Sequence, residues 1–172
     1  MQSAARKKFF AQVMEEHKKL IYKVSSMYCS RAEDRQDLMQ EMAIQIWNAL
    51  PKFDERFKLS TWLYRVVLNT AISHYRKSRR RNKVISPLDE SLIGVAEESA
   101  DKNLEDNLNQ LEHFIQELSE FNKALMILYL DGNSYREIAE ILGISESNVA
   151  TKISRIKRKL KEKFSTTKPH TS

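Results

Sequence analysis

The sequence predicts an all-α protein made of two helical domains joined by an acidic linker. The 172 residues include three glycines and three prolines, too few turn-formers for a β-sandwich or a barrel. Apolar residues make up 41% of the chain and recur at helical spacing, which is enough for one or two small cores. A change of charge along the chain then separates the two domains.

Charge divides the chain into three parts. Residues 1–85 contain 18 Lys and Arg against 8 Asp and Glu, residues 86–106 contain 1 against 7, and residues 107–172 contain 10 against 8. We therefore expect a first domain at 1–85, an acidic linker at 86–106, a second domain at 107–165 and a polar tail at 166–172. The basic segments favour a polyanion as partner, although a solvated Lys-rich surface has the same composition.

Several functions are disfavoured by what the sequence lacks. No apolar run approaches the roughly 20 residues of a membrane span, and no signal-peptide core follows the N-terminal basic residues. We therefore expect a cytoplasmic protein. Cys29 is the single cysteine, and no His or Cys cluster has metal-ligand spacing. With no convincing nucleophile or carboxylate pair, we expect no enzymatic activity, no cofactor and no small-molecule substrate.

The first expected helix runs from about Phe10 to Met27, because large or apolar residues recur there every three or four positions. The residues on its buried face are Val13, His17, Leu20, Val24 and Met27. We interpret His17 as a packed histidine rather than a ligand.

The second expected helix begins near Ser30, where Glu33 would complete a capping box, and stops at Pro51. Its buried stripe consists of Leu38, Met42, Ile46 and Leu50. The opposite face is polar and acidic within a basic domain, and it carries Asp37, Gln40, Glu41 and Asn48. This face is either ordinary solvated surface or a docking face for a basic partner helix.

The third expected helix begins with Ser60 as its N-cap. β-Branched residues in its middle also fit a strand, but a length of about 20 residues and a single apolar stripe favour a helix. That stripe consists of Leu63, Val67, Thr70, Ala71 and His74.

A second stripe on this helix joins an aromatic ring to polar and basic residues: Trp62, Val66, Asn69, Ser73 and Arg76, followed by Lys77, Arg79, Arg80, Arg81 and Lys83. An aromatic ring can stack on a base, and clustered cations bind phosphates. This mixture suits a melted strand better than an intact duplex. The alternative is that Trp62 belongs to the core.

The second domain has the pattern of a helix-turn-helix. Two apolar stripes precede it, at Leu108, Leu111, Ile115 and Leu118 and at Phe121, Leu125 and Leu128. Gly132 can then end a helix, Ser134 and Glu137 match a capping box, Gly143 supplies a tight turn and Ser145 can cap the next helix. With Ile138, Ala139 and Leu142 facing inward, a helix-turn-helix is favoured over a generic helical hairpin.

The last expected helix has two opposite faces. The buried side consists of Val149, Ile153, Ile156 and Leu160, and the exposed side of Ser147, Thr151, Ser154, Arg155 and Arg158. Short hydroxyls and guanidinium groups can read base edges in the major groove. The flanking lysines, expected to meet phosphates, are Lys152, Lys157, Lys159, Lys161 and Lys163.

These motifs together resemble the extracytoplasmic-function (ECF) sigma factors of bacterial RNA polymerase, the compact class with only the second and fourth conserved regions. DLMQE at 37–41, ALPKFD at 49–54 and STWLYRVVLNTAISHYR from Ser60 are similar to the second region. LSEFNKALMILYLDG and the helix-turn-helix are similar to the fourth. The resemblance covers about residues 10–84 and 107–163. It implies a promoter-specificity subunit that binds core RNA polymerase and directs transcription initiation.

The resemblance also implies residue roles. Core polymerase would be bound at the clamp helices of its largest subunit by Asp37, Gln40, Glu41 and Asn48, and at its flap by the second domain. The minus-10 element, including a flipped base held by the loop from Phe53 to Lys58, would be bound by Phe53, Lys58, Trp62, Asn69, Ser73, Arg76, Lys77, Arg79 and Arg80. The minus-35 duplex would be bound by Ser147, Asn148, Thr151, Lys152, Ser154, Arg155 and Arg158.

The sequence departs from the family at three positions. Ser119 replaces a usual proline, Lys123 a usual arginine, and Ala150 a common basic residue. The last of these moves direct readout toward Thr151, Arg155 and DNA shape. Members of the class are often held inactive by an anti-sigma factor, commonly at the inner membrane, which makes such a protein a candidate partner beside polymerase and promoter DNA.

Two other functions fit part of the sequence. A dimeric helix-turn-helix regulator of duplex operators explains residues 134–163 but gives no reason for the acidic face at 37–41 or the stripe from Trp62 to Arg76. A metal-dependent nuclease would be attracted to nucleic acid by the same charge.

Overall fold

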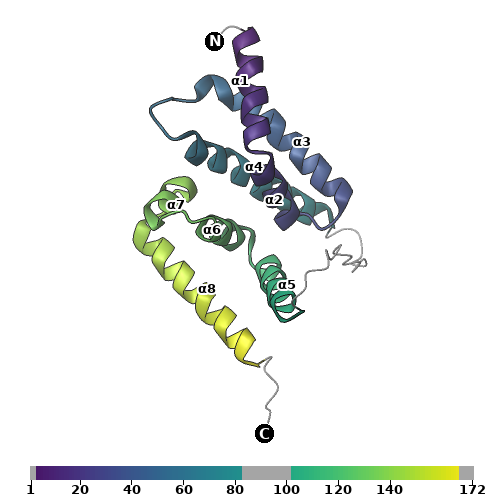
Figure 1. Ribbon diagram of the computed structural model, residues 1–172, viewed down its shortest axis with the longest axis vertical. Coiled ribbons are helices and arrows are strands. Elements are labelled where there is room, and N and C mark those ends of the chain that lie inside the picture. The colour runs from purple at the N-terminus through teal and green to yellow at the C-terminus, as the bar shows by residue number, and fades with distance from the viewer. Residues whose placement is uncertain (1–2, 83–101, 167–172) are drawn as a thin grey trace. The chain divides into compact units, whose positions relative to one another are not determined.

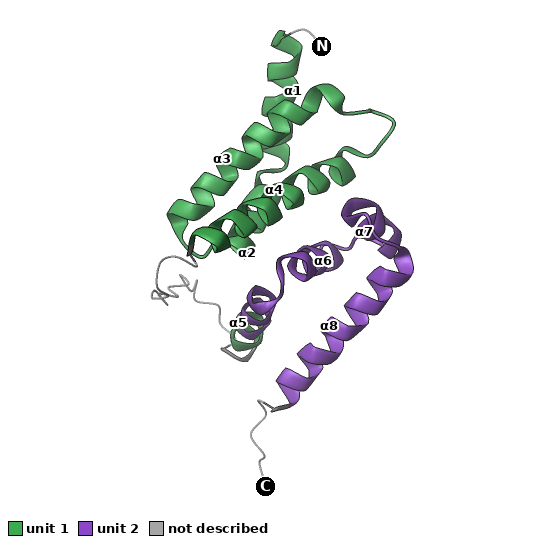
Figure 2. Ribbon diagram, turned by 180° about the vertical axis from the view of Figure 1, so that it is seen from behind, with its two compact units in different colours: residues 1–109 green, residues 110–172 purple. Residues whose placement is uncertain are grey.

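Figure 1 shows the computed structural model of the chain, which describes residues 3–82 and 102–166. All regular elements in these ranges are helices, and they form two compact units, residues 1–109 and 110–172 (Figure 2). The predicted all-α class is therefore confirmed. Residues 86–101 of the expected linker (86–106) and residues 167–172 of the expected tail (166–172) lie outside the described residues.

Unit 1 contains α1 (Ser3–Glu16), α2 (Lys18–Tyr28), α3 (Ala32–Ala49), the 3₁₀ turn η1 (Leu50–Lys52) and α4 (Leu59–Asn82). Helices α2, α3 and α4 all contact one another, and α1 contacts α2, α3 and η1. Burying a Leu, Ile or Met side chain contributes about 1.5–3 kcal/mol. The core includes Ile21, Val24, Leu38, Met42, Ile46, Leu50, Leu63, Val67 and Leu68, all at most 1% exposed.

The prediction of one helix from Phe10 to Met27 is wrong, because the chain breaks at His17 into α1 and α2. His17 leaves helical geometry at φ −113° and ψ 15°, and it is half-buried. At two places the buried residue of α2 lies one position later in the sequence than predicted. A shift of one residue corresponds to a rotation of about 100° around the helix axis. Ile21 and Tyr28 are buried, whereas Leu20 and Met27 are half-buried.

Two predicted helix starts are also wrong. The N-cap of α3 is Arg31 rather than Ser30, and within the described part of the chain its side chain makes no capping hydrogen bond. Because the helix starts one residue later, Ser30 and Glu33 form no capping box. Helix α4 starts at Leu59, so Ser60 lies in its first turn instead of capping it.

Unit 2 is built from α5 (Lys102–Glu117), which crosses the boundary between the units, and from α6 (Glu120–Leu130), α7 (Tyr135–Leu142) and α8 (Glu146–Thr166). Helices α6, α7 and α8 contact one another pairwise. The start of α5 shows that residues 102–106, expected in the linker, are helical. On α5, Leu108 is 54% exposed, so only the later part of its predicted stripe, at Ile115, is buried.

The helix-turn-helix forms as predicted. Ser134 and Glu137 make a reciprocal capping box, and the Ser145 hydroxyl accepts a hydrogen bond from the Asn148 backbone N–H at 3.1 Å. Gly132 (φ 83°) and Gly143 (φ 71°) adopt the left-handed conformation that glycine tolerates best. One inward residue was misassigned, because Ile141 is buried and Leu142 is half-buried.

Candidate functional site

The polar face of α3 is exposed as expected. Asp37, Gln40 and Asn48 are exposed, whereas Glu41 is half-buried because its carboxylate lies 3.1 Å from Nδ1 of His74 on α4. The face also contains an apolar residue that the sequence analysis did not select: Ile44, which is 57% exposed. Its spacing from residues 37, 40, 41 and 48 already placed it on this side of the helix. The face therefore combines an apolar centre with polar and acidic neighbours.

Aromatic rings gather where η1 leads into the loop before α4. The Phe53 ring lies 5.1 Å from the Trp62 ring and 6.4 Å from the Phe9 ring, centroid to centroid. All three side chains are half-buried. Trp62 is therefore neither a fully buried core residue nor a fully exposed platform, and Phe53 is engaged on two sides.

The loop from Phe53 to Lys58 is shaped by a local ion pair. Nη2 of Arg56 lies 2.6 Å from Oδ2 of Asp54, and the Arg56 backbone N–H donates to Oδ1 of Asp54 at 3.0 Å. The hydrogen bonds from Arg56 hold the pKa of the Asp54 carboxyl below its usual value and raise the pKa of the guanidinium. This geometry leaves Phe57 66% exposed next to Lys58. Phe57 was not predicted from the sequence, although an aromatic residue between two cations is a usable signal.

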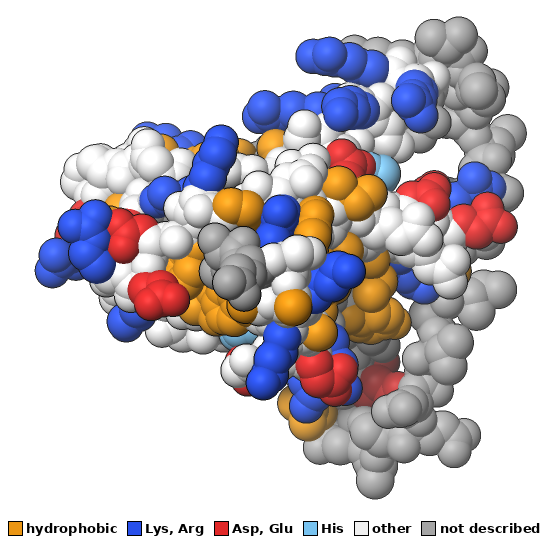
Figure 3. All heavy atoms as spheres, turned by 90° about the horizontal axis from the view of Figure 1, so that it is seen from above, with side chains coloured by type: hydrophobic (Ala, Val, Ile, Leu, Met, Phe, Trp, Pro, Cys, Tyr) orange, Lys and Arg blue, Asp and Glu red, His pale blue; other side chains and the backbone are white. Residues whose placement is uncertain are grey.

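The outer stripe of α4 lies on the surface. Its predicted contact residues Asn69, Ser73, Arg76, Lys77, Arg79 and Arg80 are all exposed. In the space-filling view, Lys and Arg side chains project from the visible face in several groups, with Asp and Glu side chains between them (Figure 3).

The predicted reading face of α8 is also exposed. Ser147, Asn148, Thr151, Ser154, Arg155 and Arg158 are all exposed, while Val149, Ile153 and Ile156 are at most 3% exposed. The Thr151 hydroxyl donates to the Ser147 carbonyl oxygen at 2.9 Å, so its oxygen can still accept a hydrogen bond. The face thus presents hydroxyls and two guanidinium groups along one side of α8.

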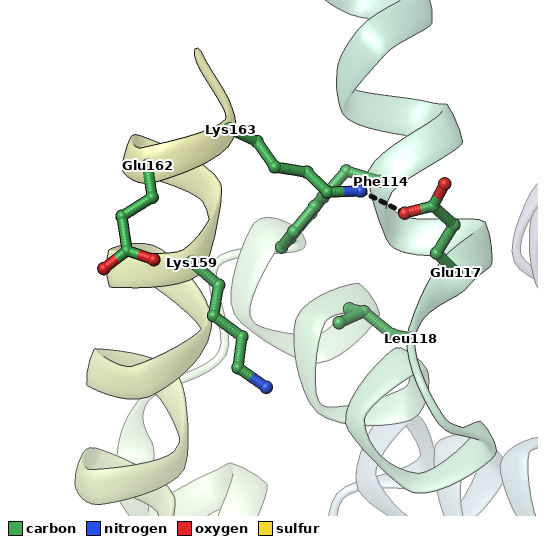
Figure 4. Close-up of a pocket in the computed structure, with 6 residues that line it drawn as sticks. All are labelled: Phe114, Glu117, Leu118, Lys159, Glu162 and Lys163. Atoms are coloured by element: carbon green, nitrogen blue, oxygen red, sulfur yellow. Dashed lines mark hydrogen bonds and ion pairs between the residues drawn. The ribbon is translucent and has the colours of Figure 1, made fainter. Parts of the chain in front are cut away.

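Three of the lysines expected to flank this face lie over rings of other helices. The ammonium of Lys152 lies 5.4 Å from the Phe121 ring centroid, and that of Lys157 lies 4.5 Å from the Tyr129 ring centroid. A hydrogen bond to Tyr129 raises the pKa of Lys157. Lys163 pairs with Glu117 on α5 and holds the pKa of that carboxyl low (Figure 4). The expectation that these lysines meet phosphates stays a prediction. Lys157 and Lys163 are exposed, but each already contacts a residue of a neighbouring helix.

Open grooves run along unit 2 between α8 and the helices α5 and α6. One, of about 440 Å³, is lined by Phe114, Glu117, Leu118, Lys159, Glu162 and Lys163. Figure 4 shows the Lys163 side chain extending toward Glu117, with the Phe114 side chain beside that of Lys163. The Glu162 side chain points away from Glu117. A second groove of about 430 Å³ shares Leu118, Lys159 and Glu162 with the first and includes Arg155 and Arg158. The two arginines therefore lie at the border between the exposed face of α8 and this groove.

Within residues 3–82 and 102–166, no helix is long and apolar enough to span a membrane. The same ranges contain no group of three or more His, Cys, Asp or Glu residues that could hold a metal ion.

Comparison with known proteins identifies the family. Sigma-70 region 2 matches residues 13–81, and sigma-70 region 4 matches residues 108–160. The ECF sigma factor SigW of Bacillus subtilis is 29% identical over 166 residues, covering 90% of this chain and 88% of SigW. The ECF sigma-E factor of Haemophilus influenzae is 26% identical, covering 92% of this chain and 88% of that protein. This chain belongs to the ECF family of RNA polymerase sigma factors.

Two solved structures share its fold. The sigma factor RpoE of Bartonella quintana, in complex with the anti-sigma factor NepR, aligns with a TM-score of 0.74 at 21% identity, covering 94% of this chain and 99% of that one. CnrH, in complex with the cytosolic domain of CnrY, aligns with a TM-score of 0.66 at 20% identity, covering 94% of this chain and 91% of CnrH.

Proposed function

We propose that this sigma factor binds core RNA polymerase through α3 and directs it to promoters recognised at two separate elements. The observation that carries this proposal is the polar face of α3, which holds the carboxylates of Asp37 and Glu41 within an otherwise basic unit. A stand-alone DNA-binding protein gains nothing from carboxylates there, because they would repel the phosphates of its ligand. A sigma factor needs such a face for a partner protein.

The composition of that face supports the proposed polymerase contact. Ile44 supplies an apolar centre, and Asp37, Gln40 and Asn48 supply a polar rim, the usual anatomy of an interface hot spot. The carboxylates of Asp37 and Glu41 would complement a basic partner helix, for which the clamp helices of the largest polymerase subunit are the family's candidate. Glu41 would contribute to this contact with its carboxylate positioned by the interaction with His74.

The minus-10 contact is proposed for α4 and the loop before it. The exposed cations at the end of α4 would bind the phosphates of the non-template strand, and aromatic surface would stack on unpaired bases. Since the Phe53 ring already contacts Phe9 and Trp62, the exposed Phe57 is a better candidate than Phe53 for direct contact with a flipped base.

The minus-35 contact is proposed for the exposed face of α8 in the major groove of duplex DNA. Arg155 and Arg158 would pair with guanine, with Thr151 and Ser154 accepting or donating beside them. Lys157 and Lys163 would stabilise the packing of α8 against α6 and α5 instead of binding phosphates, because they contact Tyr129 and Glu117 on those helices. Lys159 is exposed at the edge of this face and remains a candidate phosphate contact.

An anti-sigma factor is a further candidate partner. Both solved relatives were obtained as complexes, RpoE with the anti-sigma factor NepR and CnrH with the cytosolic domain of CnrY. A partner that covers the α3 face would keep this chain away from polymerase until a signal releases it. When free, the chain would act in the cytoplasm on the nucleoid.

Reconstituted transcription tests the proposal. The purified chain and core polymerase are incubated with sheared genomic DNA of the source organism, and transcript 5′ ends are mapped. We expect start sites that share two upstream sequence elements and that disappear when the chain is omitted. Binding to duplex DNA without such transcripts would favour the helix-turn-helix regulator. Metal-dependent loss of intact DNA caused by the chain alone would favour the nuclease.

A further inference from the structure

The first part of α1 lies outside the match to sigma-70 region 2, which starts at residue 13, yet it contacts two of the proposed functional elements. In Figure 1, α1 stands beside the end of α3, where the chain turns through η1 into the loop before α4. Three residues of α1 that precede the match make contacts there: Arg6, Phe9 and Phe10.

The first set of contacts holds the end of α3. The guanidinium of Arg6 lies 3.9 Å from the Trp47 ring centroid and donates a hydrogen bond to the Trp47 carbonyl oxygen. The Phe10 ring meets the Trp47 ring edge-on, with centroids 5.3 Å apart. Cation–π and edge-to-face contacts of this kind are directional, so they set the orientation of α1 as well as its position.

The second set of contacts reaches the DNA-facing side of unit 1. The Phe9 ring stacks on the Phe53 ring at 6.4 Å, and the Phe53 ring in turn meets the Trp62 ring at 5.1 Å. Three rings from α1, the loop and α4 therefore form a continuous row. Phe53 begins the loop that ends at Lys58, so the row fixes one end of this loop, while Asp54 and Arg56 brace its middle.

From this arrangement we infer that α1 is a positioning element for minus-10 strand binding, acting through the Phe9 ring on Phe53 and Trp62. Removing the Phe9 ring leaves a gap on one side of Phe53, which allows Phe53 and the Trp62 ring beside it to change rotamer. Strand binding would then have to order these rings at the moment of contact, and the affinity would fall. The inference rests on the proposed minus-10 role of unit 1 and adds a helix that the family match does not include.

The packing of α1 indicates that Phe9 positions the loop and contributes little to the stability of the core. Val13 is the residue of α1 that is buried in the core, whereas Phe9 and Phe10 are half-buried. The fully buried core of unit 1 otherwise comes from α2, α3, η1 and α4. Truncating Phe9 should therefore loosen the loop while leaving this core intact.

The test compares Phe9→Ala, Phe9→Leu and Phe9→Tyr with the wild-type chain, each reconstituted with core polymerase. The readout is binding of a fluorescently labelled single-stranded oligonucleotide carrying the minus-10 element identified by transcript mapping. One aromatic contact corresponds to a two- to tenfold change in affinity, so we expect a loss of about that size for Phe9→Ala. Phe9→Leu should lose part of it, because it keeps apolar volume without a ring, and Phe9→Tyr should restore it.

Two further measurements distinguish positioning from a general loss of structure. Affinity for core polymerase and the denaturation midpoint should stay close to wild type in Phe9→Leu, as should binding to a minus-35 duplex. Tyr22→Ala is the matched control, because Tyr22 is an aromatic residue of the same unit that is 57% exposed on α2. It should leave strand affinity unchanged.

The outcomes separate the inference from the proposed function. Unchanged strand affinity in Phe9→Ala and Phe9→Leu would overturn the inference while wild-type strand binding still supports the proposed function. Equal losses for the strand and for core polymerase would also overturn it, since they indicate a structural role only. If the wild-type holoenzyme does not bind the minus-10 oligonucleotide, the proposed minus-10 role is refuted, and the inference with it.

Discussion

The two units of this sigma factor build their exposed faces in different ways. In unit 2 the face of α8 follows from local signals, namely a capping box, two left-handed glycines and one periodic apolar stripe. In unit 1 the corresponding surfaces depend on tertiary contacts between different elements. Phe9 meets Phe53, Phe53 meets Trp62, and Glu41 meets His74.

Because the two units build their faces differently, substitutions in them should have different effects. A face set by helix periodicity keeps its orientation when one side chain is removed, because the backbone hydrogen bonds of the helix hold the remaining residues in place. A face assembled from tertiary contacts can change shape when a single contact is lost. Substitutions in unit 2 should therefore act on the contact they remove, whereas substitutions in unit 1 can also act on neighbouring residues.

The largest effect is expected on the α3 face. Replacing both Asp37 and Gln40 by Lys places two cations opposite the proposed basic partner helix, and like-charge contacts cost several kcal/mol. Affinity for core polymerase should fall at least about 100-fold, measured by co-elution and by fluorescence anisotropy. Both side chains are exposed, so the fold should be kept. Gln36→Lys, on the flank of the same helix, is the control, and an equal loss there would contradict a specific face.

The next effect concerns the proposed reading face of α8. Arg155→Ala should weaken binding to the minus-35 duplex by about 1–3 kcal/mol and relax the preference at one base pair, if its guanidinium pairs with guanine. Lys157→Ala should leave the salt dependence of binding almost unchanged, because its ammonium lies over the Tyr129 ring. Titrations at several salt concentrations check both. A clear drop in the salt slope for Lys157→Ala would show that this lysine meets a phosphate.

A smaller effect is expected for the local signals of unit 2. Ser134→Ala removes the capping bond to the Glu137 N–H, and loss of such a cap costs about 1 kcal/mol. Chemical denaturation monitored by circular dichroism measures this change. Ser154→Ala is the control, since Ser154 is exposed in the middle of α8. If both variants lose the same stability, the cap is not the cause.

The smallest effect is expected for the exposed pair of Glu117 and Lys163. Because Lys163 lowers the pKa of Glu117 from its ordinary value of 4.5, the pair stabilises the folded state above that value. The contribution is lost as the pH falls through the lowered pKa. Glu117→Gln should therefore be slightly less stable than wild type at neutral pH and equal to it in strong acid. Thermal unfolding across this pH range checks the sign, and a difference that grows toward acid would contradict it.

Much of the architecture could be predicted from the sequence because it depends on local chemistry. The stripe Leu38, Met42, Ile46 and Leu50 is at most 1% exposed, and the turn of the helix-turn-helix has the predicted caps. The break at His17 and the N-cap at Arg31 were not predicted. Neither residue belongs to a capping or turn motif, so no local signal marked these positions.

The sequence by itself determined the helical class, the separation of basic and acidic segments, and the polar faces of α3 and α8, because composition and a period of 3.6 residues are properties of the chain alone. Only the tertiary structure decided how side chains on those faces are used. It joined Phe53 to Phe9 and Trp62, left Phe57 exposed, and directed Lys157 and Lys163 toward neighbouring helices. Such contacts depend on which helices meet, and helix periodicity contains no information about a partner distant in the sequence.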